Sequence, residues 1–368
     1  MEACCICQSN LAKPVYESSA PFSITSLCQV LEGCTRVWHC EECGHTQTAP
    51  LPKLEKFYAE DYHILTASEE EDQLYEVRGS EKIFRTEHQI ATLLEKVNLP
   101  VNARVLDYGC GKASTLKGLC GRRDDVVPFV FDVGEQYRRF WNDFVPTANQ
   151  AISEVPVRWA GQMDAVLSFF ALEHVTDPRA FVYAVHGLLK EGGAFYFLVP
   201  NIFANTADLV VVDHVNHFSA QSLQRLLVDA GFIVREINGE AHNSAWVVVA
   251  EKGEGVGVET ETKSISQSVQ EMAAYWNEFG DRVSAFEKAG SGAAAIYGSG
   301  FYGTFIHASL EQPEAVVCFL DQNPHRQQQV LLGKPIVSPE ALPETVQRLY
   351  VGLNPRIAQM ELDAVPLP

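Results

Sequence analysis

An aspartate and two glycines, followed 25 residues later by a second aspartate, have the types and the spacing to hold a nucleoside. Asp107, Gly109 and Gly111 come directly after a short apolar run, and Asp132 ends another apolar run, 126–131. Glycine lets a tight turn approach a ligand closely, because no Cβ stands between the backbone and that ligand. A carboxylate at the end of the following strand can accept both hydroxyls of an adenosine ribose. The pattern predicts a site for a nucleoside-containing cofactor.

A second glycine turn, near the C-terminus, has the spacing of a dinucleotide loop. Gly298, Gly300 and Gly303 read Gly-x-Gly-x-x-Gly, and Asp321 ends the next apolar run. Alone, this pattern predicts NAD binding. The segment 290–368 is too short for a whole dinucleotide domain, however, so half a Rossmann sheet is the better interpretation. The first turn lacks the third glycine of that fingerprint and has an aspartate before its glycines.

Cysteines gather at the N-terminus in a pattern typical of a metal site. Cys4 and Cys7 form one Cys-x-x-Cys pair, and Cys40 and Cys43 form another, with 32 residues between the pairs. Two such pairs complete a tetrahedral four-sulfur zinc site, which is structural because no position is left for water. Seven of the ten cysteines precede residue 44, in a chain whose start shows no secretory signal. That favours metal over disulfides, although chance surface thiols remain the alternative and Cys5 could compete with Cys4.

A third group of candidate residues lies in the stretch 212–219. Asp213, His214 and His217 precede Ser219, which can cap a helix over 220–230. At the ligand edge of a sheet, His214 could act as a base, with Asp213 orienting it or exchanging a proton. A structural histidine is the alternative interpretation.

The elements that must position these residues follow from the apolar pattern. Short apolar runs before each aspartate predict buried parallel strands, and both glycine turns lie between a predicted strand and a predicted helix. Residues 80–97 have apolar side chains at helical spacing, and 251–268 are polar enough for a linker. The sequence therefore predicts an α/β protein in which ligands bind at the carboxyl ends of the strands.

Composition narrows the classes of function. The formal net charge is −19, from 28 basic and 47 acidic residues, which argues against binding a nucleic-acid backbone. No apolar run is long enough to span a membrane, and no basic segment followed by an apolar one opens the chain. A soluble cytoplasmic protein that acts on a small molecule is expected.

The run 105–111, Val-Leu-Asp-Tyr-Gly-Cys-Gly, resembles the first motif of class I S-adenosylmethionine-dependent methyltransferases. The stretch 164–175 resembles that family's fourth strand and the following loop, and 188–198 resembles its fifth strand with the preceding turn. The resemblance covers roughly residues 80–250. It implies S-adenosylmethionine as the cofactor, with the glycine turn against its amino-acid part and the second aspartate on its ribose. The cofactor-binding residues so implied are Asp107, Gly109, Gly111, Asp132, Phe170 and Ala171.

The whole chain resembles the three-domain, zinc-containing sugar C-methyltransferases of deoxysugar pathways, in which the C-terminal unit helps to hold the nucleotide diphosphate of the substrate. Two C-terminal stretches, 333–340 and 351–355, look like segments of that unit. Aligning 218–223 with the family's Phe-Ser-x-x-Ser-Leu places Asp213 and His214 on its Glu-His pair, the histidine being the proposed base. Three neighbouring family residues, a histidine, a serine and a tyrosine, are replaced by Val212, Asn216 and His217.

The resemblance implies four segments: a zinc-binding module (1–62), a Rossmann-like methyltransferase domain (75–252), a linker and helix (253–289), and a half-Rossmann substrate-binding domain (290–368). The expected reaction is methyl transfer to a carbon next to a carbonyl of a nucleotide-linked sugar. The substrate-binding residues implied are Tyr58, Tyr62, His217, Gly298, Gly300, Tyr302 and Asn354. The alternatives are O- or N-methylation of another small metabolite, or a nicotinamide-dependent oxidoreductase that uses the loop 298–303. An RNA-binding methyltransferase is disfavoured by the charge.

Overall fold

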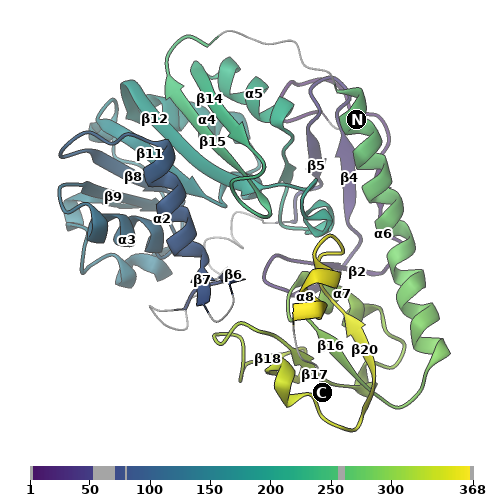
Figure 1. The fold of residues 1–368 in the computed structure, drawn as a ribbon. Helices are drawn as coiled ribbons and strands as arrows, with labels where there is room; N and C mark the ends of the chain where they lie inside the picture. Colours follow the sequence, from purple (N-terminus) through teal and green to yellow (C-terminus); the bar gives the residue numbers. More distant parts are fainter. Residues whose placement is uncertain (1–2, 53–70, 79–80, 256–261, 365–368) are drawn as a thin grey trace.

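The structure, a computed structural model, describes residues 3–52, 71–78, 81–255 and 262–364 (Figure 1). Tyr58 and Tyr62, predicted to contact the substrate, lie outside the described residues. Within these ranges the chain forms three sheets of four or more strands. No helix in the described part is long and apolar enough to cross a membrane.

The largest sheet has seven strands in the order β10-β9-β8-β11-β12-β15-β14. They are β8 (Arg104–Tyr108), β9 (Val127–Asp132), β10 (Gln150–Ile152), β11 (Met163–Phe169), β12 (Leu189–Pro200), β14 (Phe232–Asn238) and β15 (Ala245–Lys252). Neighbours pair in parallel, except that β15 runs antiparallel to β12 and β14. The strand order reverses between β8 and β11, where loops leaving the carboxyl ends diverge and open a crevice. The first glycine turn follows β8 and lies at this crevice.

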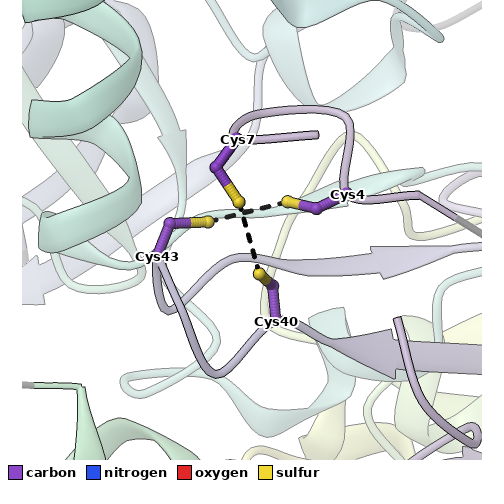
Figure 2. Close-up of side chains that lie close together, drawn as sticks. All are labelled: Cys4, Cys7, Cys40 and Cys43. Carbon is purple, nitrogen blue, oxygen red and sulfur yellow. Dashed lines mark hydrogen bonds between the residues drawn. The ribbon is translucent and has the colours of Figure 1, made fainter. Parts of the chain in front are cut away.

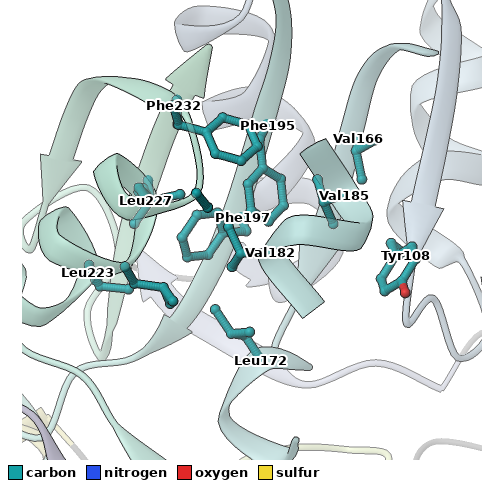
Figure 3. Packing of buried hydrophobic residues seen from close by; sticks show 14 of the residues in the cluster. Tyr108, Val166, Leu172, Val182, Val185, Phe195, Phe197, Leu223, Leu227 and Phe232 are labelled. Carbon is teal, nitrogen blue, oxygen red and sulfur yellow. The ribbon is translucent and has the colours of Figure 1, made fainter. Parts of the chain in front are cut away.

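Helices cover both faces of this sheet because side chains alternate along its strands. Phe195 of β12 packs in one apolar cluster and Tyr196 in another, on the opposite face. The first face meets α4 (Pro178–Leu188) and α5 (Ala220–Asp229), and Figure 3 shows this packing. The second face meets α2 (Arg85–Lys96) and α3 (Ser114–Arg122). The predicted Rossmann-like core is therefore present, and its packing fixes the strand ends and their turns.

The N-terminal strands form a second sheet, and one of its edge strands comes from a segment later in the chain. Its order is β1-β4-β5-β13, with β1 (Tyr16–Glu17), β4 (Arg36–His39), β5 (Thr46–Thr48) and β13 (Asn216–His217). Two hairpins lie apart from it: β2 (Phe22–Ile24) with β3 (Val30–Glu32), and β6 (Leu74–Arg78) with β7 (Glu81–Phe84). Since β13 pairs antiparallel with β5, the part of the stretch 212–219 that contains His217 is an edge strand of the N-terminal sheet.

The C-terminal part is a five-stranded sheet in the order β18-β19-β17-β16-β20. Its elements are β16 (Ala293–Tyr297), α7 (Phe301–Ser309), β17 (Val316–Leu320), β18 (Val330–Leu331), β19 (Lys334–Val337), β20 (Val346–Val351) and α8 (Ala358–Ala364). Four of the strands are parallel, as half a Rossmann sheet requires, and β18 is antiparallel. The long helix α6 (Lys263–Ala289) precedes this sheet and runs along one side of the molecule (Figure 1).

A buried aromatic cluster around Trp276 of α6 brings together the N-terminal strands, the segment that follows β12, and α7 of the C-terminal part. The Trp276 ring stacks on Tyr302 with 5.6 Å between the centroids and packs against Phe305 at 5.0 Å. Its Nε1 donates a hydrogen bond to the carbonyl oxygen of Thr206, 2.8 Å away. Tyr16 of the N-terminal sheet belongs to the same cluster. Trp276 thus lies where the N-terminal strands, the segment after β12 and the C-terminal part meet.

Trp276→Ala should lower the free energy of unfolding by about 3–5 kcal/mol, because the lost ring leaves a cavity as well as losing its burial. Urea denaturation measures this. Glu278→Ala, at an exposed position on the same helix, is the control and should change the free energy by less than about 0.5 kcal/mol. A loss below about 1 kcal/mol for Trp276→Ala would contradict its role as the junction of the sheets.

Candidate active site

A cavity of about 1080 Å³ lies at the carboxyl ends of β8, β9, β11 and β12. Its volume is sufficient for a cofactor and a second small molecule. Every residue predicted to bind the cofactor lines it: Asp107, Gly109, Gly111, Asp132, Phe170 and Ala171. Of the predicted acceptor-side residues, His214 lines the same cavity.

The glycine turn has the backbone that its sequence predicts. Gly109 and Gly111 have φ of +76° and +49°, in the left-handed region where glycine is favoured. A Cβ on Gly109 would lie 2.8 Å from the Cβ of Ala171, so only glycine fits there. Asp132 fixes the turn, since its Oδ2 accepts a hydrogen bond from the Gly111 N–H at 2.8 Å. Its Oδ1 accepts from the Gly134 N–H at 2.9 Å, and each oxygen keeps a second lone pair for a ribose hydroxyl.

Asp107 is a buried carboxyl at the end of β8 that needs a positive partner. Only 2% of it is exposed, and among the described residues its Oδ1 has no hydrogen-bond partner. Burial raises the pKa of Asp107 to about 8, and the nearby charge of Asp132 adds to the rise. A cationic group of a ligand at this end of the cavity would favour the ionised form and satisfy the carboxylate.

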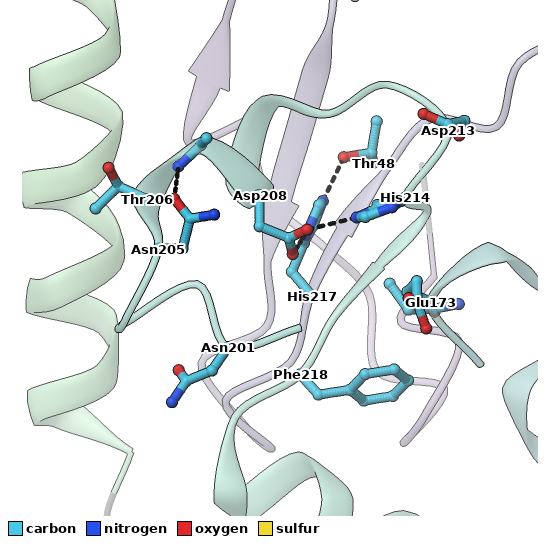
Figure 4. A network of polar contacts seen from close by, with 12 residues as sticks. Thr48, Glu173, Asn201, Asn205, Thr206, Asp208, Asp213, His214, His217 and Phe218 are labelled. Atoms are coloured by element: carbon cyan, nitrogen blue, oxygen red, sulfur yellow. Dashed lines mark hydrogen bonds and ion pairs between the residues drawn. The ribbon is translucent and has the colours of Figure 1, made fainter. Parts of the chain in front are cut away.

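Elsewhere in the cavity, the His214 imidazole is held by Asp208, from the short 3-10 helix η6 (Thr206–Val210) (Figure 4). The Asp208 carboxylate accepts from His214 Nδ1 and from His217 Nδ1, the latter at 3.3 Å. Burial acts to raise the pKa of Asp208. The charges and hydrogen bonds of the two imidazoles have the larger effect and lower this pKa. Burial likewise opposes the His214 cation, yet the Asp208 carboxylate raises the His214 pKa. Sequence reasoning missed Asp208, because no local motif marks it.

Asp213 does not orient His214 as predicted. The Asp213 carboxylate accepts hydrogen bonds from the N–H and the hydroxyl of Ser26, both at 2.7 Å. It therefore anchors the β2–β3 hairpin, and the orienting role belongs to Asp208. Sequence reasoning also left out Glu173 and His174, which line the cavity beside His214.

The structure places His217, which was predicted to contact the substrate, away from the cavity. Pairing of β13 with β5 turns its side chain into the interior, where it is fully buried and does not line the cavity. Its Nε2 lies 2.7 Å from the Thr48 hydroxyl, and its Nδ1 faces Asp208. His217 thus supports the carboxylate that holds His214.

None of the four C-terminal residues predicted to bind substrate lines the cavity; Gly300 is exposed, and the other three contact neighbouring segments of the protein. They are Gly298, Gly300, Tyr302 and Asn354. A Cβ on Gly298 would lie 2.3 Å from the Gly352 carbonyl oxygen, so close packing explains that glycine. The Tyr302 hydroxyl accepts from the Ala207 N–H at 3.1 Å, and Asn354 donates to the Ala204 carbonyl oxygen at 2.9 Å. These contacts hold the segment that carries Asp208.

The contacts of the glycine loop 298–303 do not favour a nicotinamide cofactor. Asp321, which would hold the ribose in that interpretation, accepts hydrogen bonds from the N–H and the hydroxyl of Ser299. The Arg326 guanidinium donates to the Ser299 carbonyl oxygen at 2.6 Å. Ser299, Asp321 and Arg326 are therefore engaged with one another.

The four predicted zinc ligands come together in a compact cluster (Figure 2). Their sulfur atoms all lie within 4.8 Å of one another; Cys4 and Cys43 are 3.6 Å apart, and Cys7 and Cys40 are 3.5 Å apart. Four sulfurs at about 2.3 Å from a tetrahedral zinc would be about 3.8 Å apart, so the cluster fits that ion. The Cys5 thiol points away, toward Asn216 Oδ1 at 3.2 Å, and does not compete with Cys4.

Comparisons with known proteins agree with this geometry. Residues 81–237 match the family model described as a methyltransferase domain. The ubiquinone biosynthesis O-methyltransferase of Xanthomonas axonopodis pv. citri is 29% identical over 153 residues, which are 40% of this chain and 62% of that protein. The enzyme of the same name from Acinetobacter baylyi is 31% identical over 32% of this chain and 54% of its own length. The chain thus spans less than two thirds of these relatives.

Solved structures resemble the chain more distantly. A chain of the complex between the Haloferax volcanii Trm112 methyltransferase activator and a methyltransferase has a TM-score of 0.39 at 16% identity, covering 46% of this chain and 91% of that one. An S-adenosylmethionine-dependent methyltransferase of Mesorhizobium loti has a TM-score of 0.37 at 15% identity, covering 45% and 98%. On the family match and the fold, this chain carries a class I S-adenosylmethionine-dependent methyltransferase domain.

Asp107→Asn should stabilise the cofactor-free protein at alkaline pH and weaken cofactor binding. With its pKa raised to about 8, Asp107 binds a proton in the folded state that the unfolded chain has lost, so stability falls as pH rises from about 4 to 8. Asparagine removes that fall. We expect the melting temperature of the variant to exceed that of the wild type more at pH 8.5 than at pH 5.

S-adenosylhomocysteine keeps the cationic amino group of the cofactor. Its affinity for the same variant, measured by calorimetry, should be about 10- to 100-fold lower, because a hydrogen bond between charged groups is lost. Exposed Asp124→Asn is the control. Unchanged affinity in Asp107→Asn would place the amino group of the cofactor elsewhere.

Proposed function

We propose that the whole chain transfers the methyl group of S-adenosylmethionine to a small molecule bound in the same cavity. The observation that carries the proposal is the continuity of that cavity, which is lined by Asp107 and Asp132 at the cofactor end and by His214 at the other. A cofactor and an acceptor bound side by side there could align the methyl group with the attacking atom. The net charge of −19 supports a small-molecule acceptor rather than a nucleic acid.

The acceptor atom proposed is a carbon next to a carbonyl of a nucleotide-linked sugar. Support comes from the sequence resemblance to sugar C-methyltransferases and from the Asp208–His214 pair. In the simplest form of the reaction this pair removes the proton: Asp208 binds Nδ1, so that above the raised pKa of the ring, where the imidazole is neutral, the Nε2 lone pair can accept a proton from the acceptor. Methylation of an oxygen is the second candidate, favoured by the O-methyltransferase names of the relatives.

His214→Asn should lower turnover by about 10²- to 10⁴-fold while leaving the affinity for S-adenosylhomocysteine unchanged, because a base acts on the proton in flight. Single-turnover assays and calorimetry measure the two quantities. His186→Asn is the matched control, because His186 packs against Phe232 and does not line the cavity. Full turnover in His214→Asn would remove this side chain from the mechanism.

The acceptor itself can be found by thermal shift. Sugar nucleotides and free hydroxylated metabolites are screened in the presence of S-adenosylhomocysteine, since a ligand that binds the folded state raises its apparent stability. Stabilisation by sugar nucleotides alone would support the sugar acceptor. Stabilisation only by the other metabolites would favour the second candidate.

For the four-cysteine cluster we propose one structural zinc ion. Cys40→Ser should abolish zinc content and destabilise the N-terminal sheet, because metal binding there contributes folding free energy. Metal analysis and thermal unfolding check both effects, with exposed Cys34→Ser as the control. One zinc per chain in Cys40→Ser would contradict the assignment.

A further inference from the structure

Three side chains beside the proposed acceptor position form a cluster that the methyltransferase fold does not require. Glu173 and His174 belong to the short 3-10 helix η5 (Leu172–His174), which follows β11, and His214 comes from the segment before β13. One possible ligand atom of each lies within 4.8 Å of those of the others. The two imidazole rings meet edge to face, with 4.7 Å between centroids. All three residues line the cavity.

Glu173 is the side chain in greatest need of a partner. It is 1% exposed, and neither carboxyl oxygen has a hydrogen-bond partner among the described residues. His174 Nε2 lies 4.0 Å from the Glu173 Oε1, too far for a hydrogen bond. A buried carboxyl without donors is costly, and a native protein rarely keeps one without a use.

The two histidines are oriented as metal ligands usually are. His174 Nδ1 lies 3.3 Å from the carbonyl oxygen of Asp213, and a carbonyl can only accept, so Nδ1 carries the hydrogen. His214 Nδ1 is bound by the Asp208 carboxylate. Because Nδ1 is engaged in each ring, Nε2 is the nitrogen that would coordinate a cation when the imidazole is neutral. An outer carboxylate or carbonyl on Nδ1 is the arrangement that fixes the tautomer of metal-binding histidines.

We propose that Glu173, His174 and His214 bind a divalent first-row cation such as Mn²⁺, with open positions for the oxygens of the acceptor. Two imidazoles and one carboxylate suit such ions better than Mg²⁺ or Ca²⁺, which prefer oxygen ligands alone. The inference rests on the proposed methyl transfer but changes the role of His214, from a free base to a ligand.

The cation also defines a class of acceptor. Three protein ligands on a six-coordinate ion leave room for two neighbouring oxygens, as in a hydroxyketone or a vicinal diol, and for one hydroxide. The hydroxide takes the acceptor's proton and becomes water, and the cation stabilises the resulting oxyanion or enolate. The acceptor atom then attacks the methyl carbon, and the electrons of the broken carbon–sulfur bond return to sulfur, giving S-adenosylhomocysteine.

The test uses the full-length protein after dialysis against EDTA, with its zinc content measured. Titration with Mn²⁺, followed by the electron paramagnetic resonance signal of the free ion, should give one site per chain. Glu173→Gln keeps the side-chain shape but lacks the anionic oxygen, and it should weaken Mn²⁺ binding at least about tenfold while S-adenosylhomocysteine affinity and melting temperature are retained. Exposed Glu240→Gln should bind like the wild type.

Activity separates this inference from the one it rests on. Turnover of the dialysed protein should be low and restored by Mn²⁺, and Mn²⁺ should not restore Glu173→Gln. Absence of Mn²⁺ binding, equal binding by Glu173→Gln, or full turnover after dialysis would overturn the cation site and leave methyl transfer with His214 as a base standing. Failure of the wild type to bind S-adenosylhomocysteine would instead overturn methyl transfer itself, whatever the Mn²⁺ titration shows.

Discussion

The part of the cavity that contains His214 depends on one buried negative charge, the carboxylate of Asp208. Such a charge is stable in the interior only when donors replace the water it has lost. His214 and His217 supply those donors, and Thr48 from the N-terminal sheet supports His217 in turn. The C-terminal sheet contributes through Tyr302, whose hydroxyl binds the backbone beside Asp208. Groups from the N-terminal sheet and from the C-terminal part thus support a single carboxylate beside the cavity, although the cavity itself lies at the edge of the seven-stranded sheet.

The parts of the site that follow a local pattern could be predicted from the sequence. The turn at Gly109 and the carboxylate at Asp132 lie at strand ends that apolar runs mark, and parallel strands bring such ends together. Asp208 could not be predicted, because it belongs to a short 3-10 helix that has no sequence motif, and only the fold of that segment brings its carboxylate to His214. Asp213 was misassigned because its partner, Ser26, is 187 residues away in the chain. Adjacency in sequence to His214 said nothing about the direction of its side chain.

The two glycine turns show what glycine spacing does and does not report. Both follow a parallel strand and precede a helix, and both need a backbone that other residues adopt poorly. Around Gly109 that backbone borders the cavity, whereas around Gly298 it is closed by the Gly352 carbonyl and by the Ser299–Asp321 hydrogen bonds. Spacing identifies the conformation of the turn. Only the neighbours in space decide whether a ligand can reach it.

The pairing of β13 with β5 connects the N-terminal sheet directly to the segment that carries His214. A recombinant protein that began after residue 52 would keep the seven-stranded sheet but leave Asn216 and His217 as an unpaired edge. His217 would also lose Thr48, and the charge of Asp208 would lose part of its support. Exposed strand edges are sites of self-association. Exchange of N-terminal modules between related enzymes therefore has to preserve the β5 partner strand as well as the cysteines.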